Sequence, residues 1–116
     1  MRISNLSKNT VLANRAKLAD TFFSRLIGLL NRNSLDQSEA LVITRCQSIH
    51  MFFMRFAIDA VFVNANDEVV GFVEGIKPFR ISPLFFQSSY CIELPVGTIQ
   101  KSRISIGDSL KIDKSV

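Results

Sequence analysis

Residues 49–63, IHMFFMRFAIDAVFV, decide the fold prediction for this chain. The segment is an almost continuous apolar run, interrupted only by His50, Arg55 and Asp59. Such a segment belongs in a core, where a guanidinium or a carboxylate is costly unless it finds a partner. The three polar groups therefore indicate either an internal structural network or the floor of a binding site.

Short strands are predicted on both sides of this run. Segments rich in Val, Ile and Phe alternate with turn signals, such as the sequence Asn-Ala-Asn-Asp at 64–67. Alternating apolar residues on either side of Ser7-Lys8-Asn9 predict a β-hairpin at the start of the chain. The predicted strands are 2–6, 10–15, 41–46, 48–56, 58–64, 68–74, 88–94 and 109–112.

One helix is predicted in the N-terminal half. Apolar residues at 22, 23, 26, 27 and 30 share one helical face, and they follow an N-cap at Asp20 or Thr21. The helix is expected to end near Asn31, with Gly28 inside it. The predicted fold class is mainly β: a small jelly-roll-like sandwich or barrel with one short α-helix, forming a single domain over residues 1–116.

Composition and charge narrow the class of protein. The chain is 47% hydrophobic, and its 14 Lys and Arg exceed its 10 Asp and Glu to give a net charge of +4. The basic residues form no dense run and no recognisable motif, so no specific nucleic-acid partner is expected. No signal peptide is recognised, and the longest apolar run is too short and too interrupted to span a bilayer. A cytoplasmic location is expected, with Cys46 and Cys91 as free thiols.

Four segments occur in an order that resembles a known family. They are RLIGLL at 25–30, CQSIHMFFMRFAIDAVFV at 46–63, IELPVGT at 92–98 and IGDSL at 106–110. Across nearly its whole length the chain is similar to the bacterial and archaeal domain of unknown function 192. The resemblance implies a mainly β, jelly-roll-like sandwich or barrel, and it implies no established activity.

Cys46 and His50 are candidates for a nucleophile and its base. On a straight strand they share a face but lie roughly 13 Å apart, which is beyond hydrogen-bond reach. A metal set of Cys46, His50 and Cys91, completed by Asp59 or Glu93, matches no compact zinc spacing. No metal site and no cofactor are therefore predicted, and no residue is assigned a catalytic role.

Arg55 and Asp59 are also four residues apart, so on a strand they cannot pair directly. Their partners must lie on neighbouring strands or in a ligand. Glu93 is the candidate partner for Arg55, and it is predicted to point away from the face of Ile92 and Leu94. These charges either fix strand register or leave Arg55 free to hold an anion.

The loop at 75–87 carries a second cluster of candidate residues. Its cationic and aromatic side chains lie between two predicted strands, and they cover the core, a ligand or a partner. They are Lys77, Phe79, Arg80, Phe85 and Phe86.

Three functional hypotheses follow from these clusters. The first is a binding module for a small anionic or carbohydrate-like ligand. The second is a hydrolase or transferase that uses His50, Asp59 or Cys46. The third is a protein-interaction module that binds a protein partner or forms a weak homodimer through the 75–87 loop. The predicted ligand-binding residues are His50, Arg55, Asp59, Phe79, Arg80 and Glu93.

Overall fold

The fold is known from a computed structural model, which describes residues 1–116 except for the side chains of Phe22, Phe23 and Leu26. Strands dominate and the helices are short, so the mainly β prediction is confirmed. In chain order the elements are β1 (Arg2–Asn5), β2 (Thr10–Ala13), β3 (Arg15–Ala19), α1 (Phe22–Ile27), β4 (Glu39–Thr44), β5 (Ile58–Val63), β6 (Val69–Ile76), β7 (Tyr90–Leu94), α2 (Thr98–Lys101) and β8 (Leu110–Asp113).

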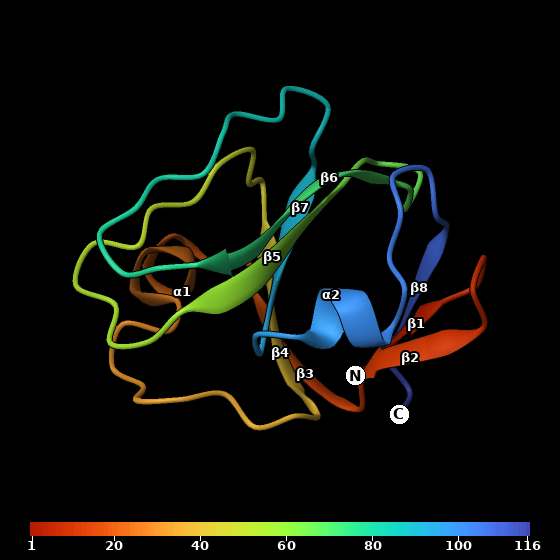
Figure 1. The fold of residues 1–116 in the computed structure, drawn as a ribbon, viewed down its shortest axis with the longest axis horizontal. Coiled ribbons are helices and arrows are strands. Elements are labelled where there is room, and N and C mark those ends of the chain that lie inside the picture. The colour runs from red at the N-terminus through yellow and green to blue at the C-terminus, as the bar shows by residue number, and fades with distance from the viewer.

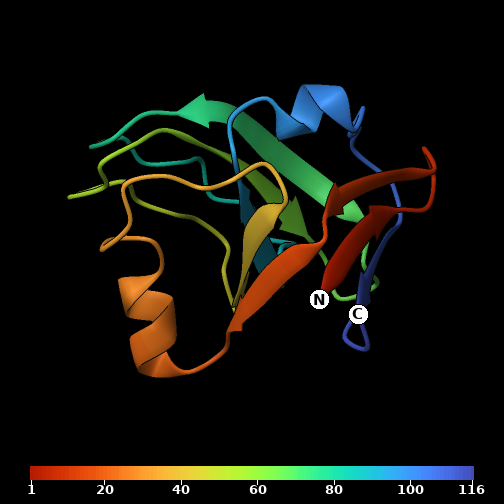
Figure 2. The same cartoon turned by 90° about the horizontal axis from the view of Figure 1, so that it is seen from below.

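The strands form two sheets. One has three strands in the order β2-β1-β8, and the other has five in the order β3-β4-β7-β5-β6. All neighbouring pairs are antiparallel except β3 and β4, which run parallel. The three-stranded sheet and α2 lie on one side of the larger sheet, and α1 lies on the other (Figures 1 and 2). The larger sheet is therefore covered on both faces.

Two apolar cores result from this layering. The first fills the space between the sheets, and the second lies between the larger sheet, α1 and the loops that follow β4 and β6. Along β5 the two cores take alternate residues: Val61 and Val63 belong to the first, and Ala60 and Phe62 to the second. Every residue of β5 is buried, as expected of a strand covered on both faces.

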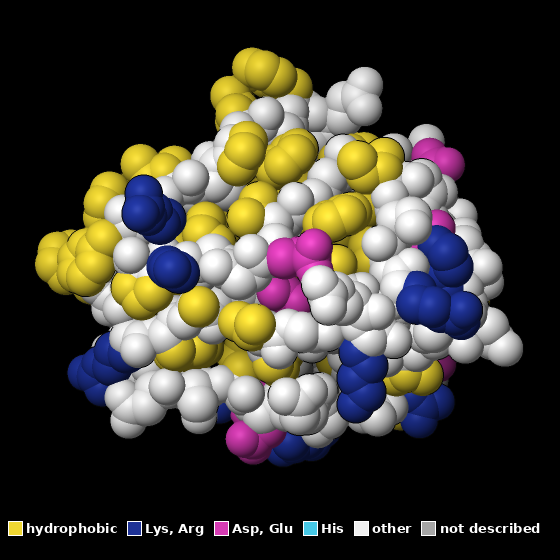
Figure 3. Space-filling model, in the orientation of Figure 1, with side chains coloured by type: hydrophobic (Ala, Val, Ile, Leu, Met, Phe, Trp, Pro, Cys, Tyr) yellow, Lys and Arg dark blue, Asp and Glu magenta, His cyan; other side chains and the backbone are white. Residues whose placement is uncertain are grey.

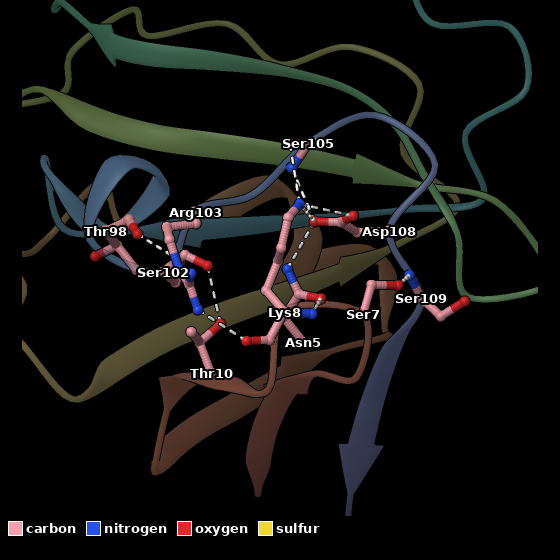
Figure 4. Close-up of polar contacts among 10 residues, drawn as sticks. All are labelled: Asn5, Ser7, Lys8, Thr10, Thr98, Ser102, Arg103, Ser105, Asp108 and Ser109. Carbon is pink, nitrogen blue, oxygen red and sulfur yellow. Dashed lines mark hydrogen bonds and ion pairs between the residues drawn. The ribbon is translucent and has the colours of Figure 1, made fainter.

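A polar cluster joins the two ends of the chain (Figure 4). The Asp108 carboxylate accepts hydrogen bonds from the Asn5 side-chain amide at 2.8 Å and the Ser105 backbone N–H at 2.9 Å, and it pairs with Lys8 at 2.9 Å. Asn5 is fully buried, so its amide depends on these partners. The cluster fixes the β1–β2 hairpin to the turn before β8.

Several predicted elements are confirmed. The hairpin of β1 and β2 forms, and the strands predicted from residues 41, 58, 68, 88 and 109 appear with shifts of one or two residues at their ends. Thr21 caps α1, accepting from the Ser24 N–H at 3.1 Å. The helix is shorter than predicted, because Gly28 adopts φ +49° and ends it as the C-cap.

The strand predicted at 48–56 is wrong. These residues form a loop whose backbone bonds to the loop after β6: the Met51 N–H donates to the Arg80 carbonyl, and the Ser82 N–H donates to the Ile49 carbonyl. A turn at Phe53, with φ +65°, breaks the extended run. Ile49, Met51 and Met54 of this loop instead cover the second core, whereas Phe52 and Phe53 are exposed. β3 and α2 are not predicted from the sequence.

Neither of the helices described in the structure is long and apolar enough to cross a bilayer.

Candidate functional site

A pocket of about 110 Å³ lies between the end of α1 and the outer face of the larger sheet. Ile27 and His50 are the exposed residues of its lining, so they mark its mouth, and the remaining lining is buried or half-buried. The polar side chains that line it are Arg25, Cys46, Ser48, His50 and Glu93. The apolar lining comes from residues 27–30, Ile43, Ile49 and Met54.

Glu93 reaches the pocket through strand alternation. In β7, Ile92 and Leu94 face the first core, so Glu93 and Cys91 face the opposite side, as the sequence predicts. α1 ends at Gly28, and the Gly28 backbone lies close to the Glu93 side chain. A Cβ placed on Gly28 would lie 3.8 Å from Glu93 Oε1. Strand register and the helix end together set the carboxyl in the pocket.

The Glu93 carboxyl is held in an environment that favours its neutral form. Burial raises the pKa of Glu93 to about 7. Among the described residues, no hydrogen bond or ion pair reaches this carboxyl, and Arg25 does not pair with it. Glu93 therefore changes charge near neutral pH, inside the pocket.

Arg25, a half-buried residue of α1, brings a positive charge to the same pocket. Its Nε is sealed from solvent and is the one buried side-chain nitrogen or oxygen, among the described residues, without a hydrogen-bond partner. A buried donor left unpaired costs about 1–3 kcal/mol, and more when it is charged. The guanidinium is therefore prepared to donate to an acceptor in the pocket.

Cys46 and Cys91 are neighbouring free thiols. The hydrogen-bonding interaction with Cys91 lowers the pKa of Cys46, and the nearby positive charge of Arg25 adds to this. Burial raises the pKa of Cys91 well above its ordinary value. The Cys46 thiol donates to the Ser48 carbonyl at 3.3 Å, and no described hydrogen bond joins it to His50. Cys46 and His50 therefore line one pocket without forming a nucleophile–base pair.

Asp59 lies away from this pocket, on the opposite face of the larger sheet. Its carboxylate accepts three backbone N–H groups, from Gly75 at 2.8 Å and from Gly97 and Ile99 at 3.0 Å each. These bonds fix the start of α2 and a bend in β6 against β5. Asp59 is one per cent exposed and has the contacts of a structural residue.

The expected Arg55–Glu93 pair does not form. Arg55 is exposed and donates to Asn33 Oδ1 at 2.8 Å, because the segment that carries it is a loop rather than a strand. Phe79 and Arg80 are exposed on the facing loop. Of the six predicted ligand-binding residues, the structure brings His50 and Glu93 together in the pocket and leaves Arg55, Asp59, Phe79 and Arg80 outside its lining.

Within the described part of the chain, no group of three or more His, Cys, Asp and Glu side chains is arranged to hold a metal ion. Cys46, His50 and Glu93 share a pocket without forming such a group.

The family model described as DUF192, an uncharacterized ACR, matches residues 3–112. The chain belongs to this family. It is 36% identical over 110 residues to a UPF0127 protein of Thermococcus sibiricus, covering 91% of this chain and 71% of that protein. It is 31% identical over 118 residues to the UPF0127 protein PF1050 of Pyrococcus furiosus, covering 97% and 98%.

A solved structure has the same fold. It is a protein of unknown function from Novosphingobium aromaticivorans, with a TM-score of 0.82 and 20% identity over 96% of this chain and 82% of that one.

Three of the four segments that carry the DUF192 resemblance meet at the pocket, and IGDSL at 106–110 lies outside its lining. Apart from Ile43, every lining residue comes from RLIGLL at 25–30, from the segment at 46–63 or from IELPVGT at 92–98. Arg25 is not among the site residues predicted from the sequence. Its signal was a charged residue at the start of an otherwise apolar motif, and the same reasoning that singled out Arg55 applies to it.

Proposed function

We propose that this protein is a binding module for a small anionic ligand, held in the pocket between Arg25 and Glu93. The observation that carries the proposal is the buried, unpartnered Arg25 Nε at a pocket with room for another molecule. A carboxylate or phosphate oxygen is the acceptor that a guanidinium pairs with best.

The size of the pocket limits the ligand. An apolar cavity of about 150 Å³ is large enough to hold benzene. The volume here, about 110 Å³, suits a compact group such as a short carboxylate or a phosphate. A whole sugar ring is too large for this pocket to enclose. A small anionic ligand is therefore favoured over a carbohydrate-like one.

Glu93 couples binding to pH. With its pKa at about 7, the carboxyl is neutral below neutrality and offers a hydroxyl donor to an anion. Above that pH it becomes a carboxylate, which repels the ligand and competes for Arg25. We therefore expect anion affinity to fall as the pH rises through about 7.

The hydrolase or transferase alternative is supported by one observation, the lowered pKa of a Cys46 thiol that lines the pocket. Asp59, another proposed participant, lies away from the pocket and accepts three backbone N–H groups. Cys46 donates to the Ser48 carbonyl, and no described hydrogen bond joins it to His50. Binding therefore remains the proposal.

Titration with acetate and with inorganic phosphate, followed by backbone amide NMR shifts, tests the proposal. In the wild-type protein below neutral pH, the amides of Gly28, Cys46 and Glu93 are expected to shift in a saturable way. Arg25→Gln should weaken this response at least about tenfold, since it removes the charged donor. Raising the pH to about 8 should weaken it as well, and Glu93→Gln should remove that pH dependence.

Arg55→Gln is the matched control, because Arg55 is an exposed arginine outside the pocket lining. Its titration is expected to match the wild type. No saturable shift at the pocket with either anion would overturn the proposal. Equal losses in Arg25→Gln and Arg55→Gln would remove Arg25 from its central role.

A further inference from the structure

Two loops pair along one edge of the molecule and present a row of exposed apolar side chains. The loop after β4 and the loop after β6 are joined by backbone hydrogen bonds from Gln47–Phe85 at one end to Met51–Phe79 at the other, with a bridge between His50 and Ile81. We call the exposed apolar row the aromatic ridge: Phe52, Phe53, Phe79, Ile81, Leu84 and Phe86.

The rings of the ridge are held outward rather than folded onto a core. Phe53 and Phe86 are 76% and 77% exposed. Phe53 and Phe79 both have a left-handed backbone, at φ +65° and +67°, which is unfavourable for a bulky side chain. Their ring centroids lie 6.2 Å apart, and Phe52 lies 6.5 Å from Phe79. Strained residues that expose apolar rings are typical of contact sites.

The same loops carry only positive charge. Arg45, Arg55, Lys77 and Arg80 are exposed on them, and the sequence holds no Asp or Glu in 45–58 or 75–92. In the view of Figure 3 hydrophobic side chains project at the left edge beside Lys and Arg side chains, and no acidic side chain is visible there. The surface is therefore complementary to an anionic partner with an apolar interior.

We propose that the aromatic ridge docks onto the surface of an anionic lipid bilayer. The rings and the aliphatic side chains of Ile81 and Leu84 enter the apolar boundary, while the four cations contact lipid phosphates. This inference is independent of the proposed anion pocket, although the stacking of His50 on Phe52, at 5.4 Å, places the pocket mouth beside the ridge.

Other partners fit the ridge less well. A symmetric contact with a second copy would bring the four cations of each chain against those of the other. Nucleic-acid bases stack on aromatic rings, but Ile81 and Leu84 offer no stacking face. A row of projecting rings suits a deformable apolar medium better than a rigid protein surface.

Co-sedimentation of the full chain with vesicles tests the proposal. Vesicles of phosphatidylcholine are compared with vesicles that also contain phosphatidylglycerol. The wild-type protein is expected to bind the anionic vesicles, with binding that falls as salt is raised. The variant Phe53→Ser with Phe79→Ser, and separately Lys77→Glu with Arg80→Glu, should each lower the partition coefficient roughly tenfold or more.

Matched controls change similar residues away from the ridge. Ile106→Ser removes an apolar side chain that is 69% exposed, and Lys111→Glu with Lys114→Glu reverses two exposed charges near the C-terminus. Both controls should bind as the wild type does. Thermal melting of each variant checks that the fold is retained.

Three results would overturn the proposal. The first is a wild-type protein that stays in the supernatant with both kinds of vesicle. The second is an equal loss in ridge and control variants. The third is a ridge-dependent dimer, or ridge-dependent RNA binding, in the absence of vesicle binding, which would assign the ridge to a second copy or to nucleic acid.

Discussion

At the scale of single residues, burial decides what each charged group can do. Glu93 and Asp59 are both buried carboxyls from predicted strands, but their surroundings differ. Asp59 has three backbone donors, whereas burial without such donors raises the pKa of Glu93 to about 7. Asp59 therefore stabilises the fold, whereas ionisation of the buried Glu93 carboxyl lowers the free energy of unfolding at neutral pH.

The cost of Glu93 is measurable as a pH-dependent difference in the free energy of unfolding. Its folded pKa, about 7, lies above its ordinary value of 4.5, so stability falls as the pH rises between these values. At or below pH 4.5, the free energy of unfolding of Glu93→Gln should match that of the wild type. At about pH 8 it should exceed the wild-type value by up to roughly 3 kcal/mol. Urea unfolding across this range measures the difference.

Glu74→Gln is the control, because Glu74 is an exposed carboxylate on β6. Its difference from the wild type should not change with pH in this window. A Glu93→Gln variant that tracks Glu74→Gln at every pH would mean that Glu93 is not desolvated.

At the scale of elements, loops as well as strands cover the second core. Phe85 in the loop after β6 lies over the larger sheet, with its ring 4.5 Å from that of Phe62. Gly71 on β6 leaves the space for that ring, since a Cβ there would overlap it. The aromatic residues of the 75–87 loop therefore have two different roles: Phe85 covers the second core, and Phe86 is exposed.

Gly71→Ala should destabilise the protein by about 1–3 kcal/mol, because the added methyl displaces the Phe85 ring. In Gly71→Ala with Phe85→Ala the methyl enters vacated space, so the two changes together should cost less than their sum. Urea unfolding of the single and double variants gives the coupling. Gly75→Ala is the control, because its cost comes from the backbone at φ +59° and not from contact with a neighbour. Its change in the free energy of unfolding should simply add to that of Phe85→Ala. Equal coupling energies with Phe85→Ala for the two glycines would contradict the predicted contact between Gly71 and Phe85.

At the scale of the whole molecule, contacts between distant parts of the sequence close the fold. β1 pairs with β8, and Asp108 joins Asn5 and Lys8 across more than ninety positions (Figure 4). Burial alone would raise the pKa of Asp108, but its hydrogen bonds with Asn5 and Lys8 lower it overall. The three-stranded sheet depends on this cluster because it has few strands of its own.

Asp108→Asn should lower the free energy of unfolding at neutral pH by about 2 kcal/mol, since it removes a charge-assisted set of hydrogen bonds. Because the folded pKa of Asp108 lies below its ordinary value of 3.8, this stabilisation is complete above that pH and is lost as the pH falls through the folded pKa. The variant and the wild type should therefore converge in strong acid. Chemical unfolding as a function of pH follows the convergence.

Asp36→Asn serves as the comparison, since Asp36 is exposed and its ion pair with Arg15 is long, at 3.7 Å. Its effect should be close to zero at every pH. A loss as large as that of Asp108→Asn would show that general charge, and not the cluster, governs stability.

The sequence alone determined the local features of this protein: its mainly β class, the hairpin at its start, the buried strand that begins at Ile58 and the orientation of Glu93 away from Ile92 and Leu94. Strand alternation and turn residues act within a few positions, so these features can be read from neighbouring residues. The segment at 48–56 shows the limit, because an apolar run fits a strand or a core-covering loop equally well.

The tertiary structure decided which polar groups meet. Arg25, Cys46 and Glu93 come from three distant segments, and they converge because β7 lies between β4 and β5 and α1 ends over that face. Arg55 and Asp59, only four positions apart, end in solvent and in the first core. Strand pairing and loop packing depend on contacts between residues far apart in the sequence. For this reason the candidate site could be identified only from the tertiary structure.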